Sequence, residues 1–379
     1  KHHVFSLANA LRARGDSVTI LGPASRPVHE PGVVTTGGIV SVESNGSANE
    51  MALFSSPFET LEFFRNRSFD VIHLHEPSIP SLGYWVTWLT PGVPKLCTFH
   101  AFADSPPLPL RVGQKLIGAL LYPLFKRGLA VSGAAAEYAA RAWTRPLSIV
   151  PNGVDTKLFT PPVSPRASTD VRLLFVGRLG DTRKGWDVLL SAYRTLLASG
   201  CNVSLDVVGD STGVAKLPEL PGLRVHGPVP LPELVERYQA CDIFVAPSLS
   251  QESFGIVLLE AMSAGRAIVC SDIRGYREVA KPAGAAFVRP GDPQALAATI
   301  LSLALDPMRR IAMQAFNRAA VRVYSWQALA DWVREHYLDV IASRSRGAAQ
   351  RRLESAGPLV TSPSKRLAST NPASSTGIV

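Results

Sequence analysis

The sequence contains 379 residues, too many for one ordinary domain and enough for two domains of roughly 150 residues each. Its apolar share of 46% suits globular cores, and no apolar stretch reaches the ~20 residues of a membrane-spanning helix. Of the formal net charge of +9, residues 341–379 contribute +5, with 6 basic residues against 1 acidic residue. The rest of the chain is nearly balanced, which argues against a nucleic-acid-binding protein.

The first 150 residues alternate between helical and strand-like patterns. Leu7 and Leu11 lie one helical turn apart and Gly15 follows as a stop signal, which predicts a helix over 3–15. Short apolar runs that end in polar or Gly/Pro residues predict strands at 17–23, 69–77, 95–100 and 128–133. This alternation is typical of a parallel sheet covered by helices. Because such a domain normally opens with a strand and a glycine-rich turn, the start on a helix predicts a first domain that is incomplete at its beginning.

A second alternating series begins near residue 171. Its strands are predicted at the runs VRLLFVGRL, VSLDVVGD, LRVHGPV, CDIFVAPS and RAIVCSD. The Asn-Gly and Pro-Pro pairs of 149–162 indicate a linker between two doubly wound domains, whose ligand site we expect in the cleft at the carboxyl ends of the strands. The expected organisation is a first domain at 1–150, a second domain at 151–325, a helix at 326–342 that crosses back to the first domain, and a disordered basic tail at 343–379.

The four cysteines, Cys97, Cys201, Cys241 and Cys270, lie far apart in the chain. They form no Cys-x-x-Cys pair and are not accompanied by histidines at zinc spacing. We therefore interpret them as core thiols of a cytosolic protein and predict no metal site.

Two basic residues follow the first strand of the second domain. The strand ends at Gly177-Arg178, and Lys184-Gly185 comes six residues later, just before a predicted helix near Trp186. A strand–turn–helix connection that carries Arg and Lys is typical of phosphate binding, because two cations and the N-terminus of a helix all attract an anion. Either residue alone would more simply be an exposed loop cation, but the two together favour a phosphate site.

The segment QESFGIVLLEAMSAG, residues 251–265, carries two carboxylates eight positions apart. Glu252 opens a turn, where it is able to accept hydrogen bonds from hydroxyl groups, and Glu260 lies two turns into an apolar helix. The backbone N–H groups of Gly255 and Ile256 are available to an anion at the start of that helix. Phosphate-binding groups next to carboxylates that accept hydroxyl hydrogen bonds predict a nucleotide-sugar site.

The motifs FVGRLGDTRKG, APSLSQESFGIVLLEAMSAG and IVPNGVD resemble the donor site of family 4 retaining glycosyltransferases of the GT-B fold. The resemblance implies an α/β fold with two Rossmann-like domains facing across a cleft. It implies that Arg178 and Lys184 neutralise the leaving diphosphate without an obligatory metal. It also implies that Glu252 contacts the donor sugar and Glu260 the ribose. The further donor contacts that it implies are Ser253, Phe254, Gly255, Ile256, Val257 and, in the 226–234 loop near the base, Val229.

The first domain resembles the bacterial phosphatidylinositol α-mannosyltransferases. The segments that carry this resemblance are GPAS (22–25), SNGS (44–47), HEPSIPSL (75–82) and CTFHA (97–101). By position, His100 is expected beside the transferred sugar.

Three features on the acceptor side depart from that family. The glycine-rich loop ahead of the first helix is absent, and Ser78 replaces an expected Asn. Glu59 and Glu62 lie in 56–67, where the relatives have a basic helix that touches the membrane. The apolar residues of this region suit either insertion at a membrane interface or core packing: Phe54, Phe58, Leu61, Phe63 and Phe64.

These features predict a metal-independent retaining glycosyltransferase whose catalytic residues are His100, Arg178, Lys184 and Glu252. The expected donor is GDP-mannose, the acceptor a phosphatidylinositol-type lipid, and the location the cytoplasmic face of the plasma membrane, where the protein is peripheral on an anionic surface. Two alternatives stay open. One is another nucleotide sugar with a soluble acceptor such as inositol phosphate or a glycan, and the other is a nucleotide-sugar-binding relative without activity.

Overall fold

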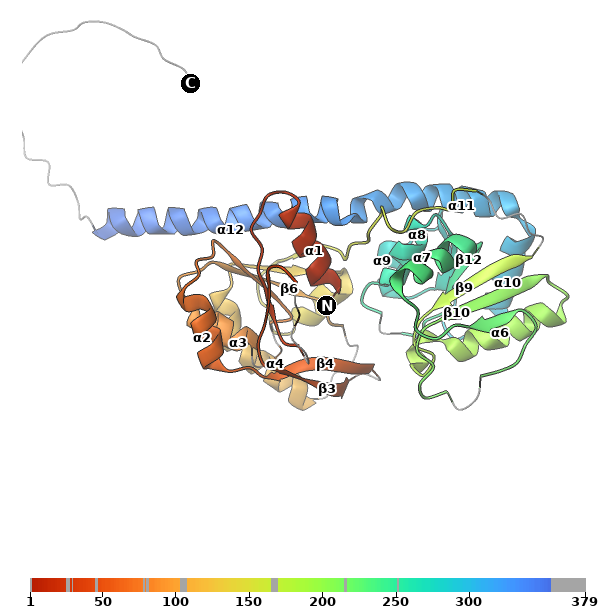
Figure 1. Cartoon of the computed structure of the whole chain (residues 1–379), viewed down its shortest axis with the longest axis horizontal. Coiled ribbons are helices and arrows are strands. Elements are labelled where there is room, and N and C mark those ends of the chain that lie inside the picture. Colours follow the sequence, from red (N-terminus) through yellow and green to blue (C-terminus); the bar gives the residue numbers. More distant parts are fainter. Residues whose placement is uncertain are drawn as a thin grey trace, which may run out of the picture.

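The computed structural model describes residues 2–24, 28, 30–44, 47–77, 79, 82–102, 108–164, 170–214, 217–250 and 252–355, without the side chains of 39–54, 109–110 and 344–355. Two α/β domains follow one another along the chain, and the C-terminal helices α11 (Pro307–Ala320) and α12 (Trp326–Ser355) run along the same side of both (Figure 1). The predicted α/β architecture with parallel sheets is confirmed.

The second domain contains one parallel sheet of six strands, in the order β11-β10-β9-β12-β13-β14. The strands are β9 (Val171–Val176), β10 (Val203–Val208), β11 (Leu223–Val225), β12 (Ile243–Ala246), β13 (Ala267–Ser271) and β14 (Ala285–Val288). The central strands are buried on both faces, which explains why they read as continuous apolar runs in the sequence. The covering helices are α6 (Trp186–Ala198), α7 (Leu231–Ala240), α8 (Ile256–Ser263), α9 (Arg274–Val279), α10 (Pro293–Leu305) and α11.

The first domain divides its strands among three sheets. The main sheet is parallel, in the order β5 (Ile72–His75), β6 (Lys95–Phe99), β7 (Arg127–Ala130) and β8 (Leu147–Ile149). Two separate pairs accompany it, the parallel pair β1 (Ile20–Gly22) with β2 (Val33–Thr35) and the antiparallel pair β3 (Gly38–Ser44) with β4 (Ser47–Phe54). In the part of the chain that the structure describes, no strand pairing joins either pair to the main sheet. The helices of this domain are α1 (His2–Arg12), α2 (Pro57–Arg65), α3 (Leu82–Leu89), α4 (Leu108–Leu121) and α5 (Gly133–Ala139).

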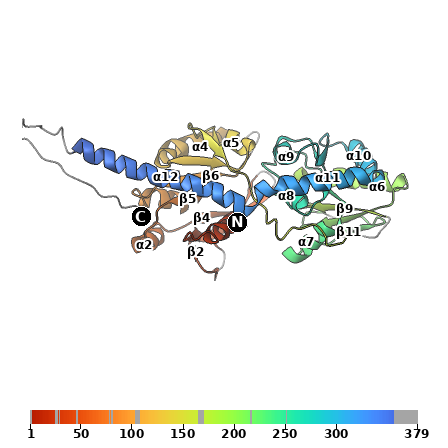
Figure 2. The same cartoon turned by 90° about the horizontal axis from the view of Figure 1, so that it is seen from above.

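Helix α12 packs against the first domain, although it follows the second domain in the chain (Figure 2). Trp326 and Leu329 of α12 share a buried apolar cluster with Leu11 of α1. Ion pairs join the same two segments: Arg14 with Asp331, and Arg334 with Asp16 at 3.1 Å. The helix extends to Ser355, past the end at 342 that the sequence pattern predicts, because the Ala, Arg, Gln and Leu residues that follow are good helix formers. Residues 356–379 lie outside the described part of the chain.

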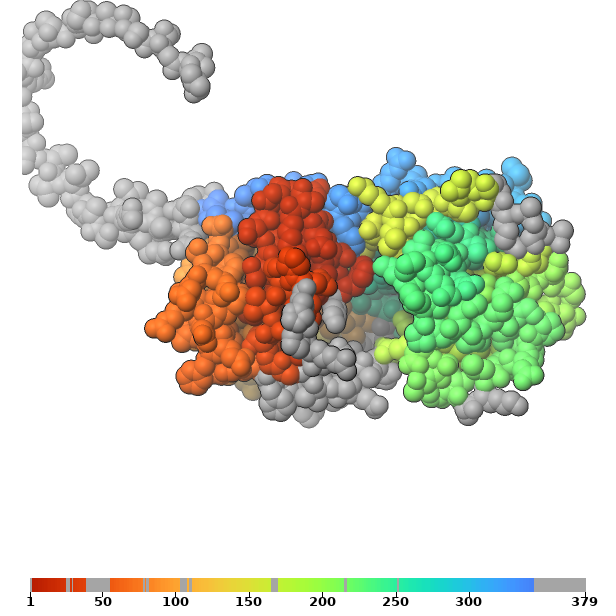
Figure 3. Space-filling view, in the orientation of Figure 1, coloured from red at the N-terminus to blue at the C-terminus, as the bar shows by residue number. Residues whose placement is uncertain are grey.

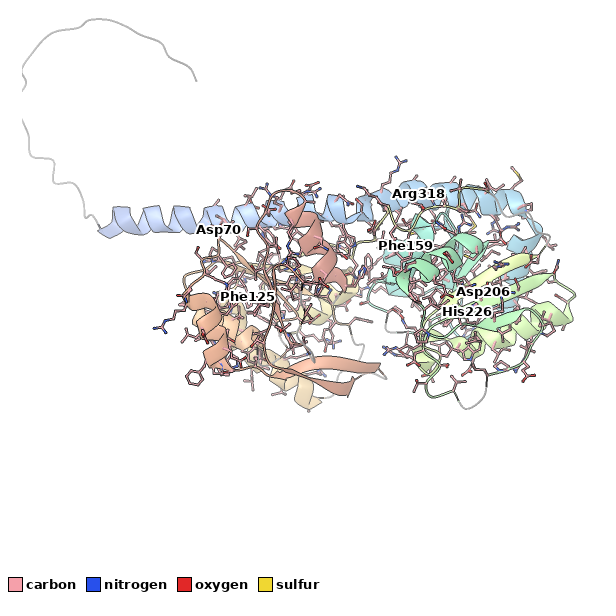
Figure 4. The ribbon with its side chains drawn as sticks, viewed as in Figure 1. Asp70, Phe125, Phe159, Asp206, His226 and Arg318 are labelled. Carbon is pink, nitrogen blue, oxygen red and sulfur yellow. The ribbon has the colours of Figure 1, made fainter. Side chains whose placement is uncertain are left out.

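The segment that connects the domains is held by one arginine of α11. The guanidinium of Arg318 donates hydrogen bonds to the carbonyls of Thr156 at 3.3 Å, Phe159 at 3.4 Å and Ser263 at 2.7 Å. Figure 4 shows Arg318 on its helix with Phe159 of the connecting segment beneath it. The linker is therefore fixed to the second domain rather than hanging between the two.

A direct contact between the domains determines which edges of the sheets face each other. The carboxylate of Glu278, on α9, accepts hydrogen bonds from the backbone N–H groups of Gly133 at 2.7 Å and Ala134 at 3.1 Å, in the first turn of α5. Arg274 of α9 also pairs with Glu137 of α5. Helix α5 follows the carboxyl end of β7, and α9 follows that of β13, so the carboxyl edges of the two main sheets face each other. Figure 3 shows a hollow where the two lobes meet.

A candidate active site at the domain junction

The second domain places its candidate residues at the switch point of its sheet. Strands β9 and β12 are neighbours in the centre of the sheet, and the connections from them run to opposite sides. In open parallel sheets, ligands bind outside the carboxyl ends of the strands at such a point. Arg178 and Lys184 follow β9, and Glu252 follows β12, so all three lie at this position.

A glycine allows the loops after β9 and β12 to approach closely. Gly185 has a φ of 71°, and a Cβ atom there would lie 2.0 Å from the carbonyl oxygen of Pro247. The backbone N–H of Leu249 donates to the carbonyl of Arg183 at 2.7 Å, which ties the two loops together. Since only glycine tolerates both the positive φ and this contact, the sequence Lys184-Gly185 holds the lysine beside the second loop.

The approach of the two loops brings Lys184 and Glu252 into an ion pair, in which the Lys184 ammonium donates to Glu252 Oε1. The hydroxyl of Ser248 also donates to Glu252 Oε1, at 3.4 Å, and shares a 2.7 Å hydrogen bond with the buried Tyr276. The predicted phosphate-binding cation and the predicted sugar-binding carboxylate are thus partners of each other in this structure.

Arg178 lies on the same connection and is 43% exposed. Its Nη2 donates to Asp181 Oδ2 at 3.3 Å, and Arg183 binds the same carboxylate at 2.6 Å and 2.9 Å. Burial acts to raise the pKa of Asp181, but the hydrogen bonds and charge of Arg183 outweigh it, so the pKa of this carboxyl is lowered. Asp181 therefore stays ionised at neutral pH and anchors the turn that presents Arg178.

The remaining predicted donor contacts differ in how much they offer to a ligand. Ile256, the first residue of α8, is 40% exposed, whereas Phe254 is buried in the core and has only its backbone available. Gly255 has a φ of 87° and lies against the ring of Tyr276. Ser253 is half-buried, and Val257 and Val229 are partly buried against the same core.

The loop that carries Val229 begins at a fixed point. His226 Nε2 and Asp206 Oδ1 share a 2.7 Å hydrogen bond, and Arg224 donates to the same carboxylate at 2.9 Å and 3.1 Å. Figure 4 shows Asp206 and His226 together inside the second domain. Burial acts to raise the pKa of Asp206, but the bonds from Arg224 and His226 outweigh it and lower the pKa, so the carboxylate remains charged.

Glu260 lies on α8 and is paired with a tyrosine. The hydroxyl of Tyr238, on α7, donates to Glu260 Oε2 at 2.7 Å. Burial raises the pKa of Glu260 to about 7, and the Tyr238 hydrogen bond only partly opposes this rise. The two carboxyl groups of the 251–265 segment therefore have different environments, one in an ion pair and one beside a neutral hydroxyl.

The first domain contributes histidines from three elements to the facing edge. His100 follows β6, and its Nε2 shares a 2.9 Å hydrogen bond with Nδ1 of His75, the last residue of β5. The ring of His3, on α1, lies edge-on to that of His100 with centroids 4.7 Å apart, and His3 Nδ1 is 2.8 Å from Asn152 Oδ1. Burial lowers the pKa of His3 to about 4 and holds the pKa values of His75 and His100 well below 6.5, so these rings are neutral at pH 7.

A buried glutamate positions the loop that carries His100. The carboxylate of Glu76 accepts hydrogen bonds from the backbone N–H groups of His100 and of Ala101, the latter at 2.5 Å. Among the described residues, Glu76 is the one non-glycine residue with a positive φ, at 54°. Such a conformation costs energy and persists where the surroundings impose it, as the two hydrogen bonds do here.

Sequence reasoning missed several residues of this site. His3, His75 and Glu76 lie inside segments that were predicted only as a helix and a strand. In the first domain, His100 was the one residue predicted to contact the donor. Asn152 belongs to the motif IVPNGVD, and its contact with His3 spans 149 positions of the chain. Ser248 belongs to the motif APSLSQESFGIVLLEAMSAG but was not singled out, and Tyr238 gave no signal, since a tyrosine on a helix is common in any α/β domain.

Two family models match consecutive parts of the chain. The model of Glycosyltransferase Family 4 matches residues 1–158, and that of Glycosyl transferases group 1 matches residues 170–306. The chain is 32% identical over 353 residues to a phosphatidyl-myo-inositol mannosyltransferase of Mycobacterium leprae, covering 91% of this chain and 94% of that one. It is 29% identical over 381 residues to a D-inositol 3-phosphate glycosyltransferase of Xylanimonas cellulosilytica, covering 86% and 88%.

A solved glycosyltransferase from Rickettsia africae has the same fold, with a TM-score of 0.71 at 17% identity, covering 90% of this chain and 94% of that one. The fold and the site together define a glycosyltransferase of the GT-B class, as predicted. The chain belongs to the family 4 glycosyltransferases, and its curated relatives include phosphatidyl-myo-inositol mannosyltransferases.

The contact at Gly185 generates a first prediction. We expect Gly185→Ala to reduce turnover strongly and to destabilise the second domain, because the new Cβ forces Lys184 away from the β12 loop. Gly200→Ala is the matched control, since Gly200 has a φ of 74° and a Cβ atom there would meet nothing within 4 Å. The control variant should lose only about 1–2 kcal/mol of stability, which is what a side chain costs at a positive φ, and its turnover should be unchanged. Urea unfolding and transfer assays measure both effects, and equal losses in the two variants would contradict the steric explanation.

The environment of Glu260 generates a second prediction. Its folded-state pKa of about 7 lies above the unfolded value, so the carboxyl destabilises the fold progressively as the pH rises through 7. We expect Glu260→Gln to stabilise the protein more at high pH than at low pH. The gain in the free energy of unfolding over the parent protein should be about 1–3 kcal/mol larger at about pH 8.5 than at about pH 5. Glu236→Gln, at an exposed position of the neighbouring helix α7, should show no such pH dependence. A pH-independent effect of Glu260→Gln in urea melts would refute the raised pKa.

Proposed function

We propose that this glycosyltransferase transfers mannose from GDP-mannose to a phosphatidylinositol-type lipid, with retention of configuration and without an obligatory metal. The observation that carries the donor half is the group formed by Arg178, Lys184 and Glu252 at the switch point of the second sheet. Two cations suit a diphosphate, and a carboxylate next to them suits sugar hydroxyl groups. The names of the mannosyltransferase relatives support the choice of sugar and acceptor.

The ion pair between Lys184 and Glu252 suggests how the donor is received. An incoming diphosphate competes with Glu252 for the Lys184 ammonium, and Arg178 offers the second positive charge. When Lys184 turns to the phosphate, Glu252 Oε1 loses its cation and is able to accept hydrogen bonds from the sugar. Donor binding thus exchanges one charge pair for another, and no charged group is left buried without a partner.

The chemical step requires no protein nucleophile in this proposal. The acceptor hydroxyl attacks the anomeric carbon from the face on which the diphosphate leaves. The bond between that carbon and the phosphate oxygen breaks, and the acceptor proton passes to the departing phosphate. Arg178 and Lys184 stabilise the negative charge that develops on the diphosphate, and His100 of the first domain contacts the sugar in this proposal.

Exposed apolar side chains on the first domain support a lipid acceptor. Along α4, four aliphatic residues recur at every fourth position and are 50–68% exposed: Leu108, Val112, Leu116 and Leu120. Arg111 and Lys115 lie beside this stripe on the same helix. An apolar helix face flanked by basic residues is suited to the surface of an anionic bilayer.

Helix α2, whose sequence suits either membrane insertion or core packing, divides between the two. Phe58 is 80% and Leu61 is 47% exposed, whereas Phe63 is buried and Phe64 packs against the core of the first domain. The side chain of Phe54 lies outside the described part of the structure. None of the described helices is both long and apolar enough to cross a membrane.

A soluble acceptor is the alternative that a specific observation favours. The chain covers 88% of a relative named D-inositol 3-phosphate glycosyltransferase, at 29% identity. Incubating the protein with labelled GDP-mannose and, in parallel, phosphatidylinositol vesicles or inositol 3-phosphate distinguishes the two. Label in the lipid fraction supports our proposal, and label only in the water-soluble product overturns it.

The donor site generates a third prediction. We expect Arg178→Ala and Lys184→Ala each to lower kcat/KM for the donor by about 10- to 150-fold, the loss of one charge-assisted hydrogen bond of roughly 1.5–3 kcal/mol. Because Arg178 is 43% exposed, its replacement should change thermal stability little, whereas Lys184→Ala also removes the cation partner of Glu252 and should lower thermal stability somewhat. Arg194→Ala, at an exposed position of α6, is the control and should behave like the parent protein. Near-normal turnover of both site variants at limiting donor would remove the assignment.

The stripe on α4 generates a fourth prediction. We expect Leu116→Glu to weaken binding to anionic vesicles that contain phosphatidylinositol by about tenfold or more, because a buried aliphatic side chain contributes about 1.5–3 kcal/mol. Binding of the parent protein should also fall as salt is added. Leu305→Glu is the matched control, since Leu305 is 76% exposed but lies on the second domain. If both variants sediment with vesicles equally well, α4 does not contact the membrane.

A further inference from the structure

The histidine cluster formed by His3, His75 and His100 brings together three imidazoles from α1, β5 and the loop after β6. One ring nitrogen from each residue lies within 4.8 Å of the others. We propose that the histidine cluster binds one transition-metal ion of the Zn²⁺ type, and that the bound ion excludes the donor sugar from the first-domain side of the cleft. The ion is thus an inhibitor that occupies the site and not a participant in transfer.

The chemistry of the three rings suits such an ion. Zn²⁺ binds neutral imidazole nitrogens at about 2.0–2.1 Å, so that ligand atoms in a tetrahedral site lie about 3.3 Å apart. The shared hydrogen bond between His75 Nδ1 and His100 Nε2 already brings those two atoms to 2.9 Å. If an ion replaces the shared proton, these two nitrogens must move apart by a few tenths of an ångström, and the ring of His3 must move modestly closer to them.

The surroundings orient the ligands. The hydrogen bond of His3 Nδ1 to Asn152 Oδ1, at 2.8 Å, fixes that ring and leaves Nε2 for an ion. A hydrogen bond from the second ring nitrogen to a protein oxygen is typical of histidines that bind metal. The carboxylate of Glu76, next to His75 in the chain, is held near the cluster by the N–H groups of His100 and Ala101.

A fourth, partly buried histidine has a structural role and provides a contrast. His73 also lies on β5, but both its nitrogens are engaged, Nδ1 with the Tyr337 hydroxyl at 2.8 Å and Nε2 with the Thr98 hydroxyl at 2.7 Å. Its ring therefore has no nitrogen to offer. In the histidine cluster, by contrast, the rings contact one another: His75 shares a hydrogen bond with His100, and His3 lies edge-on to His100. A bound ion would take the place of these contacts.

The inhibitory effect rests on the proposed function, because it assumes that His100 contacts the donor sugar, whereas metal binding itself does not. Three protein ligands leave a tetrahedral ion one open position, which water or a sugar hydroxyl fills. An ion beside His100 withdraws that imidazole from hydrogen bonding with the donor. Metal and donor should then compete for the same free enzyme.

Binding is tested first, with Co²⁺ as a spectroscopic substitute for Zn²⁺. Titrating Co²⁺ into the full chain should give the intense visible absorption of a tetrahedral site at a stoichiometry of one, and Zn²⁺ should abolish it. We expect His3→Gln and His75→Gln each to weaken binding by at least about tenfold. His2→Gln is the matched control, because His2 is exposed and adjacent in sequence. Circular dichroism establishes that each variant is folded, and two variants protect the test against the failure of one.

The outcomes separate the two halves of the proposal. Absence of the tetrahedral spectrum, or equal affinity in His2→Gln, His3→Gln and His75→Gln, overturns the metal site whatever the enzyme's activity. With the site present, Zn²⁺ should raise the apparent KM for the donor without lowering kcat, and a chelator should reverse the effect. Tetrahedral binding with an unchanged donor KM overturns the inhibitory half alone, and a parent protein without transferase activity overturns the proposed function instead.

Discussion

The site depends on the contact that makes the carboxyl edges of two parallel sheets face each other. Glu278 reaches from the second domain to the first turn of α5, where its charge meets the positive end of the helix and two N–H groups without partners in that helix. A single carboxylate of the second domain thus accepts hydrogen bonds from two backbone N–H groups of the first domain. The loops at the carboxyl edges carry the polar residues of an α/β domain. This contact therefore makes the histidines of the first domain face the charged residues of the second.

Within the second domain, backbone geometry and charge work together. The absence of a side chain at Gly185 allows two loops to touch, and their contact allows Lys184 to pair with Glu252. Ionised side chains this close to an apolar core require partners, and in this structure each serves as the partner of the other. The proposed donor binding uses the same arrangement, because in it a diphosphate takes the place of Glu252 beside Lys184 and a sugar takes the place of Lys184 beside Glu252.

The sequence predicted the second domain better than the first, for a physical reason. Arg178, Lys184 and Glu252 each lie in a short contiguous motif directly after a strand, so local patterns predict them even though the Lys184–Glu252 pair itself spans 68 positions of the chain. The site of the first domain is built from contacts of long range, such as His3 with Asn152 and His75 with His100, and no local pattern encodes them. The apolar stripe of α4 was overlooked for another reason. Its spacing equals that of a buried helix face, and only the fold reveals that the face is exposed.

The two glutamates of the 251–265 segment show how one short motif places two carboxyl groups in different environments. Glu252 accepts a hydrogen bond from the Lys184 ammonium, and hydrogen bonds between charged groups are stronger than those between neutral groups. Glu260 lies two turns into α8 and is hydrogen-bonded to Tyr238. Burial raises the pKa of Glu260 to about 7. Near neutral pH it is present in both forms, able to accept a hydrogen bond when ionised and to donate one when protonated. In the proposed function Glu260 faces a ribose diol, whose hydroxyl groups both donate and accept hydrogen bonds, so that either form of the carboxyl would have a partner.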